Sequence, residues 1–205
     1  TSECDPREIG AIVYSLGNGC GKQRAGRTGH ARPVTRWRSF VLSRGERTIG
    51  TAMEEGGRQA KAGQGVRLLD VPAARRFGAW DDLHGMPSGT AFSDTIMRAA
   101  ATHYGHAGRA FLAELARDKQ CFCGLYERVK VLPEFSLSDG EGQDKRAAAR
   151  FALLAMAGEL ATEYGLTGWL EGQAIQAAAE GFKVWHLARG RGSDERRQIL
   201  EKVSC

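Results

Sequence analysis

The sequence predicts an α/β fold with a partial parallel sheet followed by an all-helical region, so that the chain is predominantly helical overall. Two short runs of β-forming residues, 37–43 and 66–71, flank a helical pattern over residues 48–61. A strand, a helix and a strand in this order form a βαβ unit, which favours parallel strands and a right-handed crossover. No β-type run of comparable strength follows residue 71, and alanine-rich helical patterns dominate from residue 92 onward.

The first expected element is a helix whose start has three local signals. Asp5 can cap the helix, Pro6 suits its first position, and Glu8 completes a capping box. The helix should stop at the glycines of residues 17–19, and a glycine-rich basic loop then continues to residue 33. The expected apolar face consists of Ile9, Ile12, Val13 and Leu16.

The two predicted strands are too few to cover a parallel sheet, which is normally buried on both faces and contains more strands. We therefore expect the strands to pair with a segment that this chain lacks, or the chain to self-associate as a homo-oligomer. In the isolated chain, apolar residues around 40–42 or 66–69 would then be uncovered and would promote dimerisation or aggregation.

The region after residue 90 is expected to form successive helices. The change in composition at this point predicts two domains, residues 1–90 and residues 91–205. The expected helices are 92–104, 107–119, 122–131, 141–164, 171–188 and 194–203.

Composition and charge indicate a cytoplasmic protein with a polyanionic partner. The net charge is +5, the polar start does not resemble a signal peptide, and no apolar run is long enough to span a membrane. Residues 22–47 contain eight Lys or Arg and a single acid, Glu46, which favours nucleic acid or nucleotide phosphate as a partner. A solvated basic face is the alternative. The five irregularly spaced cysteines predict reduced thiols and no metal site.

Residues 17–23, Gly-Asn-Gly-Cys-Gly-Lys-Gln, resemble a phosphate-binding loop but do not meet its requirements. A Walker A loop needs Gly at its start and Ser or Thr after its Lys, whereas Leu16 stands at the start and Gln23 follows Lys22. The loop also ends a helix instead of following a strand. It is either a helix stop with a mobile basic loop, or a carrier of Lys22 and Arg24 to phosphate that is held elsewhere.

Three polar residues near the predicted strands are candidates for nucleotide contact. Ser43 follows the first strand, at the edge where α/β folds bind ligands, and could contact a γ-phosphate. Glu46 could orient the attacking water or simply cap the helix at Thr48. Arg67 interrupts the second strand and needs either an acidic partner or a ligand.

Four ordered stretches carry a likeness to a known family. They are residues 5–10 with 14–25, Trp37 with 42–46, residues 62–72 (Ala-Gly-Gln-Gly-Val-Arg-Leu-Leu-Asp-Val-Pro), and residues 104–112. Over these stretches the sequence is similar to the bacterial DUF927 family. That family is described as superfamily II helicases and inactivated derivatives on phages, plasmids and integrated elements.

The resemblance implies that residues 1–90 are the C-terminal half of a P-loop (RecA-like) NTPase core, followed by a helical subdomain. In the family, the Walker A loop and the Walker B acids lie upstream of Asp5. An upstream half would therefore hold ATP and Mg²⁺, and this chain alone would bind no cofactor and hydrolyse no ATP. By the same resemblance, Ser43 is similar to a γ-phosphate sensor, and Lys22 and Arg24 resemble trans-acting basic groups. The implied parent protein is a helicase-like ATPase that acts on nucleic acid, taken here as DNA.

Two other functions fit the same residues. A non-catalytic nucleic-acid-binding module would use the basic loop, residues 22–38, and its affinity would fall steeply with salt and ignore ATP. A degenerate structural subunit would contribute only a basic finger to a partner. The candidate nucleic-acid contacts are Arg27, Arg32, Arg36 and Arg38, and the candidate nucleotide contacts are Glu46 and Arg67.

Overall fold

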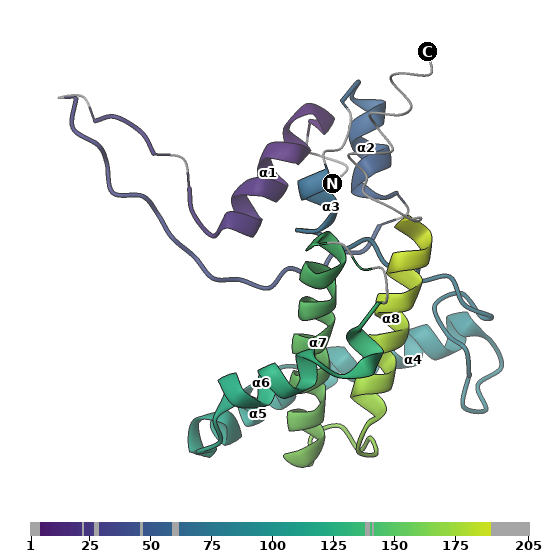
Figure 1. Cartoon of the computed structure of the whole chain (residues 1–205). Coiled ribbons are helices and arrows are strands. Elements are labelled where there is room, and N and C mark those ends of the chain that lie inside the picture. The colour runs from purple at the N-terminus through teal and green to yellow at the C-terminus, as the bar shows by residue number, and fades with distance from the viewer. Residues whose placement is uncertain are drawn as a thin grey trace. The chain divides into compact units, whose positions relative to one another are not determined.

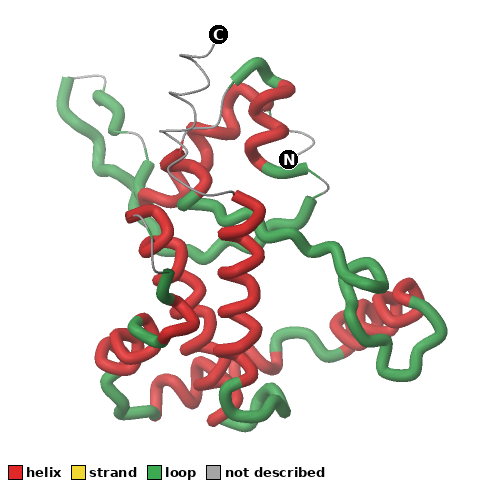
Figure 2. Tube along the Cα trace, turned by 45° about the vertical axis from the view of Figure 1, so that its right-hand side comes forward, coloured by secondary structure: helices red, strands yellow, loops and turns green. Residues whose placement is uncertain are grey.

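The structure is a computed structural model and describes residues 5–21, 23–26, 29–45, 47–58, 62–137, 140 and 142–189. Within these ranges the chain consists of helices and connecting segments (Figure 1). The described residues form no sheet: their β-pairing is limited to three isolated antiparallel bridges, and Figure 2 shows no strand. The predicted partial parallel sheet of a P-loop core is therefore wrong, whereas the predominantly helical character of the chain is confirmed.

The first predicted strand lacks a partner over most of its length. Residues 38–45 run without β-pairing, and the apolar residues 40–42 are exposed to solvent. β-forming side chains favour a strand only where neighbouring strands pack on it and complete its hydrogen bonds. No such neighbour exists among the described residues, so the local preference has no sheet to join.

The second predicted strand, residues 66–71, instead follows a short helix, α3 (Ala62–Gly65). The N–H groups of Arg67 and Leu68 both donate to the carbonyl of Gln64, at 2.9 and 3.1 Å, which coils the chain locally. The apolar side chains of this run therefore pack against helices and not within a sheet.

The chain divides into two compact units, one that ends at Asp70 and one that begins at Val71. In the first unit, α1 (Pro6–Asn18) packs against α2 (Ile49–Glu55) and α3. The core of this unit is small. One cluster contains the buried Ile9, Val13 and Met53, with Ile49, Ala52 and Leu68 packed beside them, and Val66 is also buried.

The predicted start and stop of α1 are confirmed. The carboxylate of Asp5 accepts a hydrogen bond from the N–H of Arg7 at 2.9 Å, and a proline stands in the first turn. The helix ends at Gly19, whose φ of 64° is a left-handed conformation that glycine adopts without strain. Of the expected apolar face, Ile9 and Val13 are buried, whereas Ile12 and Leu16 are exposed.

Helix α2 is shorter than the helix expected over residues 48–61. The hydroxyl of Thr48 caps it by accepting from the N–H of Thr51 at 3.1 Å. The helix ends before Gly56 and Gly57, and the second of these has a φ of 68°. Two consecutive glycines therefore stop the helix that the sequence pattern extended further.

The second unit is built on two long antiparallel helices, α7 and α8, which lie side by side in Figure 1. The shorter helices α4, α5 and α6 precede them, with a 3₁₀ turn, η1, between α6 and α7. The bounds are α4 (Gly89–Thr102), α5 (His106–Arg117), α6 (Phe122–Lys130), η1 (Pro133–Phe135), α7 (Gly142–Glu163) and α8 (Gln173–Arg189).

Small side chains allow α7 and α8 to approach closely. A Cβ atom on Gly158 would lie only 2.5 Å from the Cβ of Ala174, so this position has no room for a side chain. The rings of Phe151 and Phe182 meet between the helices with their centroids 5.7 Å apart. The buried small residues of this core are Ala147, Ala148, Ala152, Ala155, Ala174 and Ala179.

A hydrogen bond connects the ends of α5 and α7. The hydroxyl of Tyr164 donates to a carboxylate oxygen of Asp118 at 2.5 Å. Burial and this hydrogen bond raise the pKa of Tyr164 to about 12. The same hydrogen bond, together with the N–H of Gln120, lowers the pKa of Asp118 below its usual value. The pair is therefore a neutral phenol bonded to a carboxylate at neutral pH.

Candidate nucleic-acid interface

Residues 19–21 and 23–26 run antiparallel to residues 29–37 in a two-stranded ribbon, which we call the basic ribbon. At its base, Cys20 pairs with Arg36 in an antiparallel bridge. The N–H of Trp37 donates to the carbonyl of Gly19, and the N–H of Gly21 donates to the carbonyl of Thr35, both at 2.9 Å. In Figure 1 this ribbon is the long arm that leaves the end of α1.

The outer end of the ribbon is held by a second bridge, between Ala25 and Ala31. The N–H of Arg32 donates to the carbonyl of Arg24 at 2.9 Å, and the N–H of Gly26 donates to the carbonyl of His30 at 2.6 Å. Gly26 and His30 are the last described residues that pair across the ribbon. This pairing places Arg24 and Arg32 directly opposite each other.

The ribbon is not regular between its two ends. At the base, the N–H of the odd-numbered Gly21 points to the partner strand and donates to Thr35. At the outer end, the carbonyl of the even-numbered Arg24 points to the partner strand and accepts from Arg32. An odd and an even position cannot both do this in an uninterrupted strand. Pro33 lies between the two pairings and supplies no N–H. Relations between side-chain faces therefore hold within each end of the ribbon and not along its whole length.

Trp37 fixes the base of the ribbon. A Cβ atom on Gly21 would lie 3.7 Å from the Trp37 ring. The indole therefore packs against the main chain of Gly21, where no side chain intervenes. The indole N–H is buried and has no hydrogen-bond partner among the described residues. Cross-strand packing of an aromatic ring on glycine is a known device for holding strand register. The sequence pattern had instead placed Trp37 at the start of a sheet strand.

The ribbon concentrates positive charge without acidic compensation. Arg24, Arg32, Arg36 and Arg38 are all exposed, and none of them pairs with a carboxylate among the described residues. No Asp or Glu occurs anywhere between Glu8 and Glu46. Like charges directly opposite in a two-stranded ribbon destabilise it, so the facing pair Arg24 and Arg32 favours a bound anion.

The structure brings together only some of the predicted site residues. Arg24 and Arg32 meet at the outer end of the ribbon, with Arg36 at its base and Arg38 just beyond. Ser43 is exposed in the segment after the ribbon, where the described residues form no sheet edge. The predicted residues Lys22, Arg27 and Glu46 lie outside the described residues, as does the helix predicted over 194–203.

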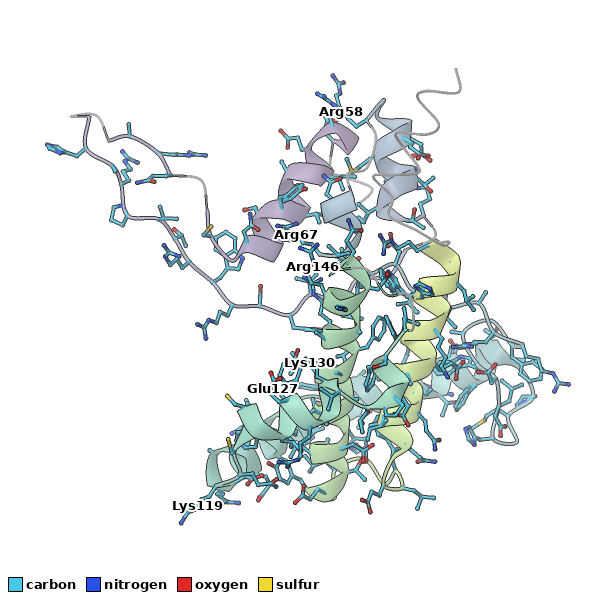
Figure 3. All side chains as sticks on the ribbon, viewed as in Figure 1. Arg58, Arg67, Lys119, Glu127, Lys130 and Arg146 are labelled. Atoms are coloured by element: carbon cyan, nitrogen blue, oxygen red, sulfur yellow. The ribbon has the colours of Figure 1, made fainter. Side chains whose placement is uncertain are left out.

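Arg67 contacts neutral groups, and no ion pair joins it to a carboxylate among the described residues. Its guanidinium donates to the carbonyl of Gly63 at 2.7 Å and to the side-chain oxygen of Asn18 at 3.2 Å. It also lies over the ring of Tyr14, 4.4 Å from the ring centroid. Figure 3 shows Arg67 beside α1. These contacts tie the end of α1, from which the ribbon departs, to α3.

Gly17 and Gly63 are the residues in the sequence that could have indicated the contact between Arg67 and Tyr14. A Cβ atom on Gly17 would lie 2.7 Å from Cδ of Arg67, and one on Gly63 would lie 2.8 Å from the hydroxyl of Tyr14. The glycines therefore make room for the arginine and the tyrosine that close over them. The sequence alone does not show that Gly17 lies near Arg67 and Gly63 near Tyr14, so both glycines were interpreted only as helix-breaking residues.

Two adjacent acids outside the ribbon, Asp81 and Asp82, have local structural contacts. Asp81 lies 3.7 Å from Arg75, and Asp82 accepts a hydrogen bond from the N–H of His84 at 2.8 Å. In the described part of the chain, no three His, Cys, Asp or Glu side chains stand close enough together to hold a metal ion. No helix in that part has the length and apolar character needed to cross a membrane.

Comparison with known proteins supports one part of the resemblance. Residues 1–36 match the model of the family described as domain of unknown function (DUF927). The matched range contains α1 and the ribbon as far as Arg36. No curated protein and no solved structure matches the chain. The similarity predicted for residues beyond this range, and the helicase-like assignment, stay predictions.

Proposed function

We propose that this chain is a non-catalytic nucleic-acid-binding module that contacts the phosphate backbone through its basic ribbon. The observation that carries the proposal is the facing pair Arg24 and Arg32 on a ribbon without any carboxylate. Like charges at directly opposed positions of a ribbon repel each other, so a shared counter-charge stabilises them, and phosphate oxygens suit the fork of donors that each arginine carries.

The spread of the charge favours a polymer over a single nucleotide. Arg36 lies four positions after Arg32 along the chain, which corresponds to roughly 13 Å at the rise of an extended chain. Arg38 continues the series beyond the base of the ribbon. A chain of phosphates can contact all of these groups together, and each contact releases a condensed counterion, which adds to affinity.

The helicase-like ATPase half that the family resemblance implies would need strands in this chain that pair with the upstream half. The described residues form no sheet, so the geometry favours the binding module. Arg67, which was expected to contact nucleotide, is engaged by Asn18 and Gly63. Restored ATP turnover on mixing with an upstream half would revive that prediction.

The test is binding of a fluorescein-labelled oligonucleotide, followed by fluorescence anisotropy over a series of salt concentrations. If the three described ribbon arginines and Arg38 all contact phosphates, the slope of log K against log salt should be about −3, at about 0.7 per contact for single strands. ATP should leave the affinity unchanged. The double variant Arg24→Gln with Arg32→Gln should weaken binding and make the slope shallower by about 1.4.

A matched control removes the same charge elsewhere. Arg58 is exposed at the far side of the first unit (Figure 3), and Arg109 is exposed on α5 of the second unit. The double variant Arg58→Gln with Arg109→Gln has the same net charge as the ribbon variant. Equal loss of affinity in the two double variants would show that net charge acts without the ribbon and would refute the proposal.

A further inference from the structure

The segment that follows the basic ribbon exposes apolar side chains among its arginines. Phe40, Val41 and Leu42 are 69 %, 42 % and 92 % exposed, respectively. Arg38 precedes them and Arg44 follows them, and both are exposed. Scattered exposed apolar residues are ordinary, but a consecutive run of this kind marks a binding surface.

The aromatic ring of Phe40 is free for a ligand. It makes no ring–ring or cation–ring contact with any aromatic or basic side chain in the described part of the chain. By contrast, Trp37 at the base of the ribbon is occupied by its packing on Gly21. The exposed surface after the ribbon therefore combines an available flat ring with flanking guanidinium groups.

A ligand for this surface must offer both flat rings and negative charge. Nucleic acid does so when its bases are unstacked, because a base can then lie on an aromatic side chain while its phosphates meet arginines. In a duplex the bases are stacked inside and present mainly phosphates, which would leave the apolar run in contact with water. Charge complementarity and the free ring therefore point to single strands.

We infer that residues 36–44 bind single-stranded nucleic acid, with Phe40 stacking on a base and Arg38 and Arg44 contacting the flanking phosphates. This inference rests on the proposed nucleic-acid-binding function and specifies its ligand. Both DNA and RNA strands carry the bases and phosphates involved, so the experiment includes each of them.

The experiment measures anisotropy of labelled oligothymidylate, oligouridylate and a DNA duplex of mixed sequence with the full chain and its variants. The chain should bind both single strands more tightly than the duplex. Phe40→Ala should weaken single-strand binding by about tenfold, since each base–aromatic stack contributes on that order. The salt slope should stay the same because stacking releases no counterions, and Phe40→Trp should retain the affinity.

The control variant is Tyr104→Ala, which removes another exposed aromatic ring, 79 % exposed, from the second unit. It should leave binding unchanged. Tighter binding to the duplex, or equal effects of Phe40→Ala on duplex and single strands, would overturn the inference. So would a dimer, seen by sedimentation, that Phe40→Ala dissociates without a change in single-strand affinity, because a second copy would then cover the segment.

The two proposals fail in different ways. If the unmodified chain binds none of the three oligonucleotides, the proposed function itself is wrong. If the chain binds them, and only the Arg24 and Arg32 variant weakens binding while Phe40→Ala does not, the ribbon function holds and the single-strand inference is wrong.

Discussion

Replacing Gly158 by Ala should destabilise the second unit, although the same replacement in an uncrowded helix is stabilising. Alanine gains about 0.5–1 kcal/mol over glycine within a helix because it restricts the unfolded chain. At Gly158, however, the new methyl group would lie 2.5 Å from the Cβ of Ala174. Carbon atoms in contact prefer about 3.5–4.0 Å, so α7 and α8 would have to separate by roughly 1 Å.

The expected magnitude follows from these opposing effects. Overpacking of a close-packed core costs typically about 1–3 kcal/mol, which exceeds the helical gain. We expect the free energy of unfolding to fall by about 0.5–2 kcal/mol. Amide hydrogen exchange along α7 measures this change in the second unit alone, since loss of protection converts directly to a free energy of opening.

Two further variants make the reasoning refutable. Gly108→Ala in α5 is the matched control, because an added Cβ there meets nothing within 4 Å, and it should be neutral or stabilising. Adding Ala174→Gly to Gly158→Ala should recover part of the lost stability by removing the clashing methyl group. If Gly158→Ala is as favourable as Gly108→Ala, or Ala174→Gly gives no recovery, the close approach of α7 and α8 is not as described.

Other predictions concern the contacts of Arg67 with the end of α1 and the hydrogen bond between Tyr164 and Asp118. Arg67→Ala should remove the hydrogen bond to Asn18 and the stacking on Tyr14, at a cost of about 1–2 kcal/mol, and hydrogen exchange in the last turn of α1 should rise accordingly. Tyr164→Phe should lower the thermal unfolding midpoint at neutral pH. The raised pKa of Tyr164, about 12, makes its contribution complete below the usual tyrosine value and lost as pH rises through 12. The lowered pKa of Asp118 makes the contribution of the carboxylate complete above its usual value and lost on acidification. The effect of Tyr164→Phe on the unfolding midpoint should therefore shrink at both ends of the pH range, and a constant effect would contradict the assignment.

The parts of the fold that could be predicted are those fixed by short-range signals. The cap at Asp5 and the left-handed stop at Gly19 define α1 within the sequence itself. The alanine-rich patterns predicted helices over 141–164 and 171–188, and α7 and α8 end within two residues of those limits. Helical hydrogen bonds close within four residues, so local composition determines them.

The prediction of a sheet was wrong because a strand needs partner strands from elsewhere in the chain, and a local sequence pattern does not show whether they exist. Residues 37–43 have the composition of a buried strand, yet nothing in the described chain pairs with residues 38–45. The site was predicted in part for the same reason. The chemistry of Arg24 and Arg32 was evident from charge, whereas their opposition depends on the register in which residues 24–26 pair with residues 30–32. The role of Arg67 required knowledge of which glycines would face it.

The facing arginines couple the shape of the ribbon to its occupancy. An anion that binds the ribbon only when its two strands are paired stabilises that paired form. The gain in free energy grows with the logarithm of the anion concentration. Conversely, whatever holds Arg24 and Arg32 together in advance, such as the cross-strand hydrogen bond between them, raises affinity by removing part of the ordering cost. Polyphosphate or sulfate should therefore stabilise the paired form of the basic ribbon and compete with nucleic acid for Arg24 and Arg32.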